Sequence, residues 1–377
     1  MDWRVEFADY PRQWRRQRAE LLPLIEDTIA RGDLVLRQQL LDFEAELARF
    51  TGSGRAVGVS DGTDGLRLLA HALDIGPGDE VVTVAHTFVA TLSPFVLRGA
   101  TPVLADIGSD HLMDTDQLTD LVTERTRVII PVHLNGRTVD MDAVRKAADS
   151  VGAVVLEDAA QALGAAFDRR AAGTFGLAST YSFNPAKMLG ALGDAGAVLT
   201  DDVALADRLL ALRDHGRVGP DELDGWGYNS RLDNLQAAIL GWRLRQLPEW
   251  IQRRRALAAR YDEMLRDLPE LQVPVAPGAD PRRFDVYQNY PVTTDRRDVL
   301  AEHLRDDGVQ TRISWPVPLH RQRGLGLDHW QLPHTERLCR RVLSLPLNPE
   351  LEDWQVEYVA ASIRRFFGDS GSGASRP

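Results

Sequence analysis

Val154-Val155-Leu156-Glu157-Asp158-Ala159-Ala160-Gln161 is an apolar run that ends in two carboxylates and then an amide. A short, continuous apolar run of this kind predicts a strand buried on both faces, as in a parallel sheet. An acid at the carboxyl end of such a strand lies in the crevice where these sheets bind ligands. Because Gln161 follows Asp158 at i+3, we expect both side chains at one site.

The same pattern extends to both sides of this run. Apolar runs at 57–59, 80–85, 101–106 and 127–132 predict further strands, and helical patterns at 64–73, 88–97 and 141–150 lie between them. Asp140 can cap the last of these helices. The alternation predicts an α/β fold with a mainly parallel sheet covered by helices on both faces.

The pattern of apolar and polar residues changes after Thr200. Helices are predicted at 203–213, 233–247 and 251–265, with Pro248 as a possible boundary. A strand at 287–292, a helix at 295–306 and a strand at 309–313 follow. We therefore expect a large domain over 1–245 and a smaller C-terminal α+β domain over 246–367. The Gly/Ser-rich residues 368–377 are expected to be a disordered tail.

Composition excludes several classes of function. The 377 residues are 44% hydrophobic and 26% charged, as in ordinary globular proteins, and the net charge of −11 argues against nucleic-acid and anionic-membrane partners. The only cysteine, Cys339, allows neither an intrachain disulfide nor a cysteine-rich metal site, and no metal is expected. The first residues lack an apolar signal core, and no apolar stretch reaches membrane-spanning length. These features predict a cytoplasmic protein.

Ser60-Asp61-Gly62-Thr63-Asp64-Gly65 follows a predicted strand and opens a predicted helix. Gly62 allows the backbone to approach a ligand closely. Thr63 adds a hydroxyl and an N–H at the helix start, where a phosphate is favoured. Taken alone, the motif fits a capped turn without a ligand equally well.

The second chemical landmark is Lys187, in Ser182-Phe183-Asn184-Pro185-Ala186-Lys187 and just before a Gly-rich stretch. Lysine is rarely buried, and desolvation would favour its neutral, nucleophilic amine. Taken alone, the position of Lys187 is better explained by a surface lysine in a loop. Pyridoxal phosphate, however, needs a phosphate cradle, a carboxylate for its ring nitrogen, an aromatic face and a lysine. Thr63, Asp158, Phe88 and Lys187 supply one of each.

These motifs together resemble the DegT/DnrJ/EryC1/StrS family of sugar aminotransferases, which are fold-type I pyridoxal-phosphate enzymes. The landmarks are residues 62–65, 87–91, 157–161, 182–187, 192–196 and 227–233. The resemblance implies a seven-stranded sheet sandwiched by helices. It implies that Lys187 forms the Schiff base, Asp158 meets the ring nitrogen, Gln161 lies near the ring hydroxyl and Phe88 stacks on the ring. Gly62, Thr63 and Ser182 would bind the phosphate. Asn229 would reach the partner subunit's cofactor in a homodimer, although it also suits a turn.

The sequence departs from the commonest family pattern at Asn184, Ser314 and Trp315. These three residues are expected to line the sugar pocket. By resemblance, the reaction moves an amino group from L-glutamate to a keto-deoxysugar nucleotide, with the cofactor cycling through pyridoxamine phosphate. C4 of dTDP-4-keto-6-deoxyglucose is the favoured position, with C3 of a 3-keto isomer as the alternative.

Three other functions stay open. Related dehydratases have histidine in place of the lysine, and some bind an iron–sulfur cluster, so Lys187 and the single cysteine argue against this class. A regulatory protein that kept the cofactor site as a relic would not need Asp158, Gln161 and Lys187 together. An aminotransferase acting on an inositol or an amino acid is distinguished only by substrate profiling.

Overall fold

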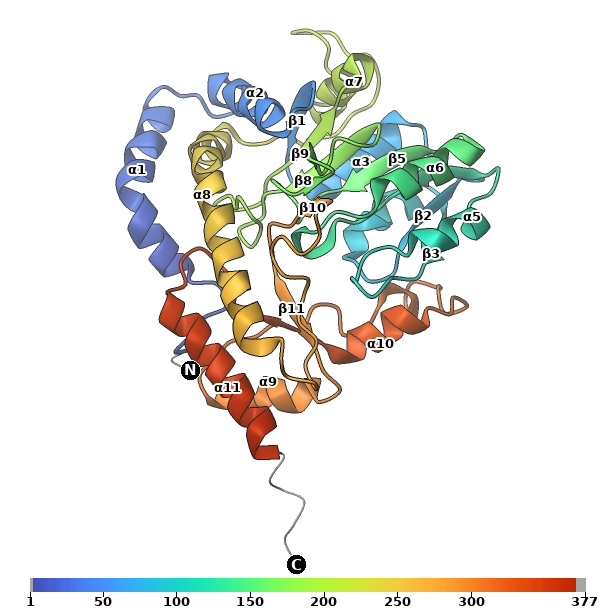
Figure 1. The fold of residues 1–377 in the computed structure, drawn as a ribbon. Coiled ribbons are helices and arrows are strands. Elements are labelled where there is room, and N and C mark those ends of the chain that lie inside the picture. Colours follow the sequence, from blue (N-terminus) through green and yellow to red (C-terminus); the bar gives the residue numbers. More distant parts are fainter. Residues whose placement is uncertain (1–2, 371–377) are drawn as a thin grey trace, which may run out of the picture.

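A seven-stranded, mainly parallel sheet lies at the centre of residues 3–370, the part of the chain described by this computed structural model (Figure 1). Its strands in spatial order are β1 (Arg55–Val59), β9 (Gly196–Thr200), β8 (Ala178–Ser182), β5 (Val154–Asp158), β4 (Thr126–Ile129), β2 (Glu80–Val84) and β3 (Thr101–Ala105). Strand β9 runs antiparallel to both of its neighbours, and the pairs from β8 to β3 are parallel. The predicted fold class is confirmed.

Successive strand residues pack on opposite faces of the sheet, as the two-residue period requires. On β5, Leu156 packs on the face covered by α3 (Gly62–Ala72), α4 (Ser93–Val96) and α7 (Val203–Arg213), whereas Val155 packs against α5 (Leu118–Leu121) and α6 (Met141–Val151). On the same side as Val155, Tyr181 and Leu199 pack with α2 (Gln38–Thr51) and α8 (Asn234–Leu265). Both faces are therefore buried, as the apolar runs predicted.

The long helix α8 leads from the sheet into the second, smaller core (Figure 1). That core holds β11 (Tyr290–Thr293) paired with β12 (Val342–Leu345), together with α9 (Arg297–Asp306) and α11 (Asp353–Ser370). The remaining elements are α1 (Tyr10–Ala30), α10 (Pro333–Arg341), a small sheet of β6 (Ala166–Phe167), β7 (Arg170–Ala171) and β10 (Arg283–Phe284), and the short 3-10 turns η1 (Val89–Thr91), η2 (Thr115–Gln117), η3 (Leu134–Gly136) and η4 (Leu319–Arg321).

Several boundaries differ from the sequence prediction. The helix expected over 88–97 is split into η1 and α4, because Pro94 has no N–H to continue a helix from the preceding turn. Pro248 lies inside α8 and does not end it. Residues 309–313 form only isolated bridges. Helix α11 continues to Ser370, and the rest of the tail expected at 368–377 lies outside the described residues. None of the described helices is long and apolar enough to cross a bilayer.

Glu157 is a fully buried carboxylate next to Asp158 on strand β5. It accepts hydrogen bonds from His133 Nε2 at 2.8 Å and from the backbone N–H groups of Gly173 at 2.7 Å, Phe175 at 2.6 Å and Gly176 at 2.8 Å. His133 Nδ1 accepts from the Val139 N–H, so the ring proton is on Nε2. Glu157 thereby ties the loop after β4 and the loop after β7 to strand β5.

We expect Glu157→Ala to destabilise the protein by about 3–5 kcal/mol, because four buried donors lose their acceptor. Urea unfolding followed by circular dichroism measures the loss. Glu124→Ala is the matched control, since Glu124 is exposed and should change stability little. A Glu157→Ala protein as stable as this control would contradict the role assigned to the carboxylate.

Candidate active site

A cavity of about 800 Å³ lies where several strands of the central sheet end and meet the smaller core. Ten of the residues singled out in the sequence line it: Gly62, Thr63, Phe88, Asp158, Gln161, Ser182, Asn184, Lys187, Ser314 and Trp315. Residues that are more than 250 positions apart in the chain thus share one space. Asn229 is the exception, because it does not line the cavity of its own chain.

Asp158 is buried at the carboxyl end of β5 with its carboxylate held in place. Its Oδ2 accepts a hydrogen bond from Thr91 Oγ1 at 2.7 Å, and its Oδ1 accepts from the Ala160 N–H at 3.2 Å. Since Thr91 has donated its only hydroxyl proton, it accepts from Thr87 across their 2.8 Å contact. The chain of hydroxyls fixes where the negative charge lies in the cavity.

The phosphate cradle predicted at the start of α3 is open on its N-terminal side. Asp61 caps the helix through the Asp64 N–H, leaving the N–H groups of Gly62 and Thr63 without an acceptor among residues 3–370. A Cβ on Gly62 would lie 3.1 Å from the Cβ of Ser182, at the end of β8. The two N–H groups and the hydroxyls of Thr63 and Ser182 therefore surround a small space suited to an anion.

Lys187 is half-buried in the same cavity. Burial lowers the pKa of its ammonium below the ordinary value. The Asp158 carboxylate opposes this shift, and the Arg312 guanidinium adds to it. A lowered pKa increases the fraction of neutral, nucleophilic amine. The chain has only two lysines, and the other one, Lys146, is exposed on helix α6.

The three residues expected to line a sugar pocket lie on two walls of the cavity. Asn184 donates from Nδ2 to Asp194 Oδ1 at 3.0 Å. Ser314 and Trp315 come from the smaller core, and Trp315 has a left-handed backbone with φ of 47°. Its ring meets the edge of His86 at 5.3 Å between centroids. Burial, helped by the charge of His111, lowers the pKa of His86 to about 3, so this contact stays uncharged.

The sequence prediction missed two further walls of the cavity. One is the N-terminal segment, which contributes Phe7, Ala8, Asp9, Tyr10 and Gln13. The other comes from the smaller core and includes Arg254, Asn289, Gln310, Arg312 and Asn348. The Phe7 N–H donates to Gln310 Oε1 at 2.9 Å, and Asn348 Nδ2 donates to the Phe7 carbonyl at 3.1 Å. No local motif in the sequence signals these contacts.

Asn229 lies on an exposed loop after helix α7. Its backbone forms a bridge with Asp214, and the nearby Trp226 is 92% exposed. Tryptophan is enriched at protein–protein interfaces relative to the rest of the surface.

The residues present fit pyridoxal phosphate. The cradle at Gly62, Thr63 and Ser182 suits its phosphate, and Asp158 offers a fixed carboxylate to its ring nitrogen. Phe88 offers a ring that is 58% exposed, and Lys187 an amine of lowered pKa. A cavity of this size also leaves room for a second, larger molecule.

Comparison with known proteins gives the family. The DegT/DnrJ/EryC1/StrS aminotransferase family model matches residues 16–364. The dTDP-3-amino-3,4,6-trideoxy-alpha-D-glucose transaminase of Streptomyces venezuelae is 41% identical, covering 96% of each chain. A pleiotropic regulatory protein of Geobacillus stearothermophilus is 37% identical over 96% of this chain and 98% of its own. The crystal structure of S. venezuelae DesV in complex with a ketimine intermediate is 40% identical, with a TM-score of 0.92 over 96% of this chain and 98% of that one. The chain therefore belongs to the DegT/DnrJ/EryC1/StrS family of pyridoxal-phosphate aminotransferases.

Proposed function

We propose that this aminotransferase moves an amino group from L-glutamate to a keto carbon of a dTDP-linked 6-deoxyhexose. The observation that carries the proposal is the single cavity in which Lys187, Asp158 and the Gly62–Ser182 cradle meet. The name of the S. venezuelae relative adds support for a dTDP-sugar.

The residues of this chain have distinct tasks in the proposed reaction. When bound, pyridoxal phosphate supplies an aldehyde for the lysine and a ring that takes up electrons. Asp158 holds a negative charge against the ring nitrogen and so keeps it protonated. Lys187 would hold the cofactor through its amine and, when that amine is free, would move a proton at the substrate carbon. Asn184, Ser314 and Trp315 face the sugar.

We propose C3 as the carbon that receives the amine. Overall resemblance favoured C4 of dTDP-4-keto-6-deoxyglucose, with C3 as the alternative. The S. venezuelae relative, at 41% identity, is named for a 3-amino sugar, and this name favours C3. C4 of the keto-deoxysugar remains the competing position.

A regulatory role is the second candidate, because one relative at 37% identity is named a regulatory protein. A binding protein has no chemical need for a lysine amine of lowered pKa beside a fixed carboxylate. This arrangement supports catalysis, and turnover separates the two functions.

We propose that Arg312 binds the carboxylate of the amino donor, glutamate. Three cationic side chains, Lys187, Arg254 and Arg312, line the cavity. Arg254 donates from Nη1 to three backbone carbonyls, whereas the Arg312 guanidinium has no hydrogen-bond or ion-pair partner within residues 3–370. Arg312 lines the same cavity as Lys187, and its charge helps to lower the Lys187 pKa. We place it on the side of the reacting carbon. The carboxylate of glutamate is attached to that carbon, whereas the nucleotide diphosphate lies beyond the sugar ring.

We further propose a homodimer with shared active sites. Asn229 is exposed and lies outside its own cavity, on a loop that carries the exposed Trp226. In a two-fold dimer this loop would bring Asn229 to the phosphate cradle of the partner, as the family resemblance implies.

The product of the purified holoenzyme tests the main proposal. With L-glutamate and dTDP-3-keto-6-deoxyglucose, NMR of the product should show an amine at C3. The kcat/KM for this sugar should be at least about tenfold higher than that for dTDP-4-keto-6-deoxyglucose. Lys187→Ala should form no aminosugar. A higher kcat/KM for the 4-keto sugar, with the amine at C4, would overturn the assigned position. No turnover of either sugar by the wild type would favour the regulatory role.

Arg312→Gln should raise KM for glutamate about 10- to 100-fold, the effect of losing one charge-assisted hydrogen bond. KM for the sugar nucleotide should change little. Arg323→Gln is the matched control, because Arg323 is exposed and does not line the cavity. If KM rises for the sugar nucleotide and not for glutamate, Arg312 binds the diphosphate and the assignment to the donor is wrong.

Mixed dimers test the shared site. Asn229→Asp should be inactive alone, since a carboxylate would repel the phosphate, and Lys187→Ala should also be inactive. Random mixing of the two subunits should restore about one quarter of wild-type activity, because half of the dimers then contain one intact site. Mixtures as inactive as their parents would show that each chain builds its own site alone.

A further inference from the structure

The amide of Gln161 is held from two sides in the cavity. Its Oε1 accepts a hydrogen bond from the Asn135 N–H at 2.8 Å and from Asn289 Nδ2 at 3.4 Å. A backbone N–H can only donate, so the atom that faces it must be the amide oxygen. The Nε2 of Gln161 is thereby turned away from both donors. It has no hydrogen-bond partner within residues 3–370 and is accessible to solvent, so it faces the open cavity.

Asn289 also fixes the first of these two donors. Its Nδ2 donates to Asn135 Oδ1 at 2.9 Å, and Asn135 has a left-handed backbone with φ of 57°. The Asn135 carbonyl in turn accepts from the Gln288 N–H at 2.9 Å. A Cβ on Gly136 would lie 2.8 Å from Val286, so only glycine lets the two segments approach this closely. The turn at 134–136 and the segment at 286–289 form one unit.

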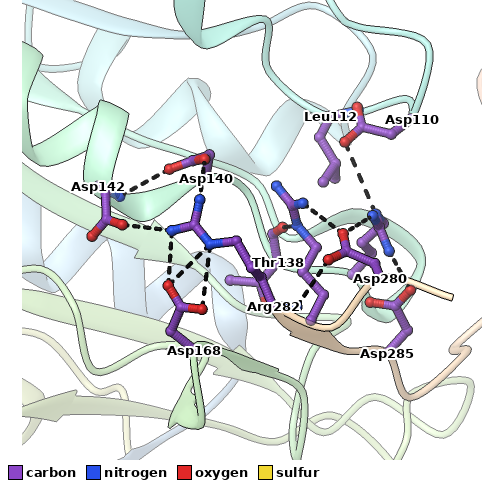
Figure 2. A network of polar contacts seen from close by, with 11 residues as sticks. Asp110, Leu112, Thr138, Asp140, Asp142, Asp168, Asp280, Arg282 and Asp285 are labelled. Atoms are coloured by element: carbon purple, nitrogen blue, oxygen red, sulfur yellow. Dashed lines mark hydrogen bonds and ion pairs between the residues drawn. The ribbon is translucent and has the colours of Figure 1, made fainter. Parts of the chain in front are cut away.

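A network of ion pairs holds that unit together (Figure 2). Arg137 donates to Asp280 at 2.7 Å and to Asp285 at 2.5 Å, and both contacts are largely shielded from solvent. Arg283 pairs with Asp280 at 2.8 Å. Nearby, Arg282 spans Asp140, Asp142 and Asp168 at the surface (Figure 2). The network fixes the chain just before Asn289, where it passes from the large domain into the smaller core.

We propose that Asn289 is a positioning residue, which orients the amide of Gln161 so that Nε2 is the group presented to the ring hydroxyl of the cofactor. The inference rests on the proposed placement of pyridoxal phosphate in this cavity. A donor at the ring oxygen stabilises its anion and competes with the Schiff-base proton for it. Asn289 therefore lowers the pKa of the Schiff base formed by Lys187, although it does not touch that nitrogen.

Other charged or titratable groups line the cavity around the proposed Schiff base, but substitution of Asn289 leaves them in place. From the large domain they are Asp61, His133, Asp158 and Asp194. From the N-terminal segment and the smaller core they are Asp9, Tyr10, Arg254, Arg312 and Glu350. Asn289 is itself uncharged, so a shift on its removal reports a change of hydrogen bonding.

Titration of the Schiff-base absorbance of the purified holoenzyme is the test. In Asn289→Ala, the Schiff-base pKa should rise by about 0.5–1 unit, the size expected when one hydrogen bond is lost. Asn289→Leu, of similar size to asparagine, should behave in the same way and serves if the alanine variant folds poorly. Gln161→Ala should shift the pKa in the same direction, and adding Asn289→Ala to it should have no further effect.

Gln38→Ala is the control, because Gln38 is exposed on helix α2 and does not line the cavity. Its Schiff-base pKa should equal that of the wild type. An unshifted pKa in Asn289→Ala, or an equal shift with and without Gln161, would overturn the proposal. If the wild type shows no Schiff-base band at all, the proposed cofactor placement fails instead.

Discussion

Glu157 has no contact with solvent, and four donors surround its carboxylate. Taking a carboxylate out of water is costly unless its hydrogen bonds are replaced, so the loops that carry these donors have little freedom to move. One of those loops contains His133 and leads into the turn at Asn135, whose N–H reaches Gln161. The next residue on the strand is Asp158. One buried charge, with no direct part in the chemistry, thus sets the position of two groups that are proposed to meet the cofactor.

The cavity offers local groups that can bind an anion, although the chain as a whole is acidic. The net charge is −11 and five acidic side chains line the cavity, yet three cationic side chains line it too. The start of α3 adds N–H groups that have no acceptor within residues 3–370. Such a local arrangement attracts small anions without favouring nucleic acid or membranes. The same cations have a second effect, because Arg312 adds to the lowering of the Lys187 pKa by burial. The proposed binding of an anionic donor at Arg312 and the lowered pKa of Lys187 therefore share one electrostatic environment.

Sequence predicted the parts of the site that are encoded locally. Asp158 ends an apolar strand, and Lys187 follows Pro185 before a Gly-rich stretch, so each pattern points to its own position in the sheet. Arg312, Asn289 and the N-terminal residues Phe7 to Gln13 were missed. The tertiary fold brings them to the cavity from distant segments of the chain, and no motif in the sequence signals this. The prediction of one helix over 88–97 was wrong, because the apolar spacing there is helical but Pro94 interrupts the helix. Periodicity could identify the sheet, but it could not tell which distant segments close the site.

The most direct test of the account is the identity of the amine that binds the cofactor. With only Lys146, Lys187 and the chain's N-terminus as candidate amines, borohydride reduction of the holoenzyme followed by peptide mass spectrometry gives an unambiguous answer. The account predicts the reduced cofactor on the peptide that contains Lys187 and none on the exposed Lys146. Label on Lys146, on the N-terminus, or on no peptide would contradict it.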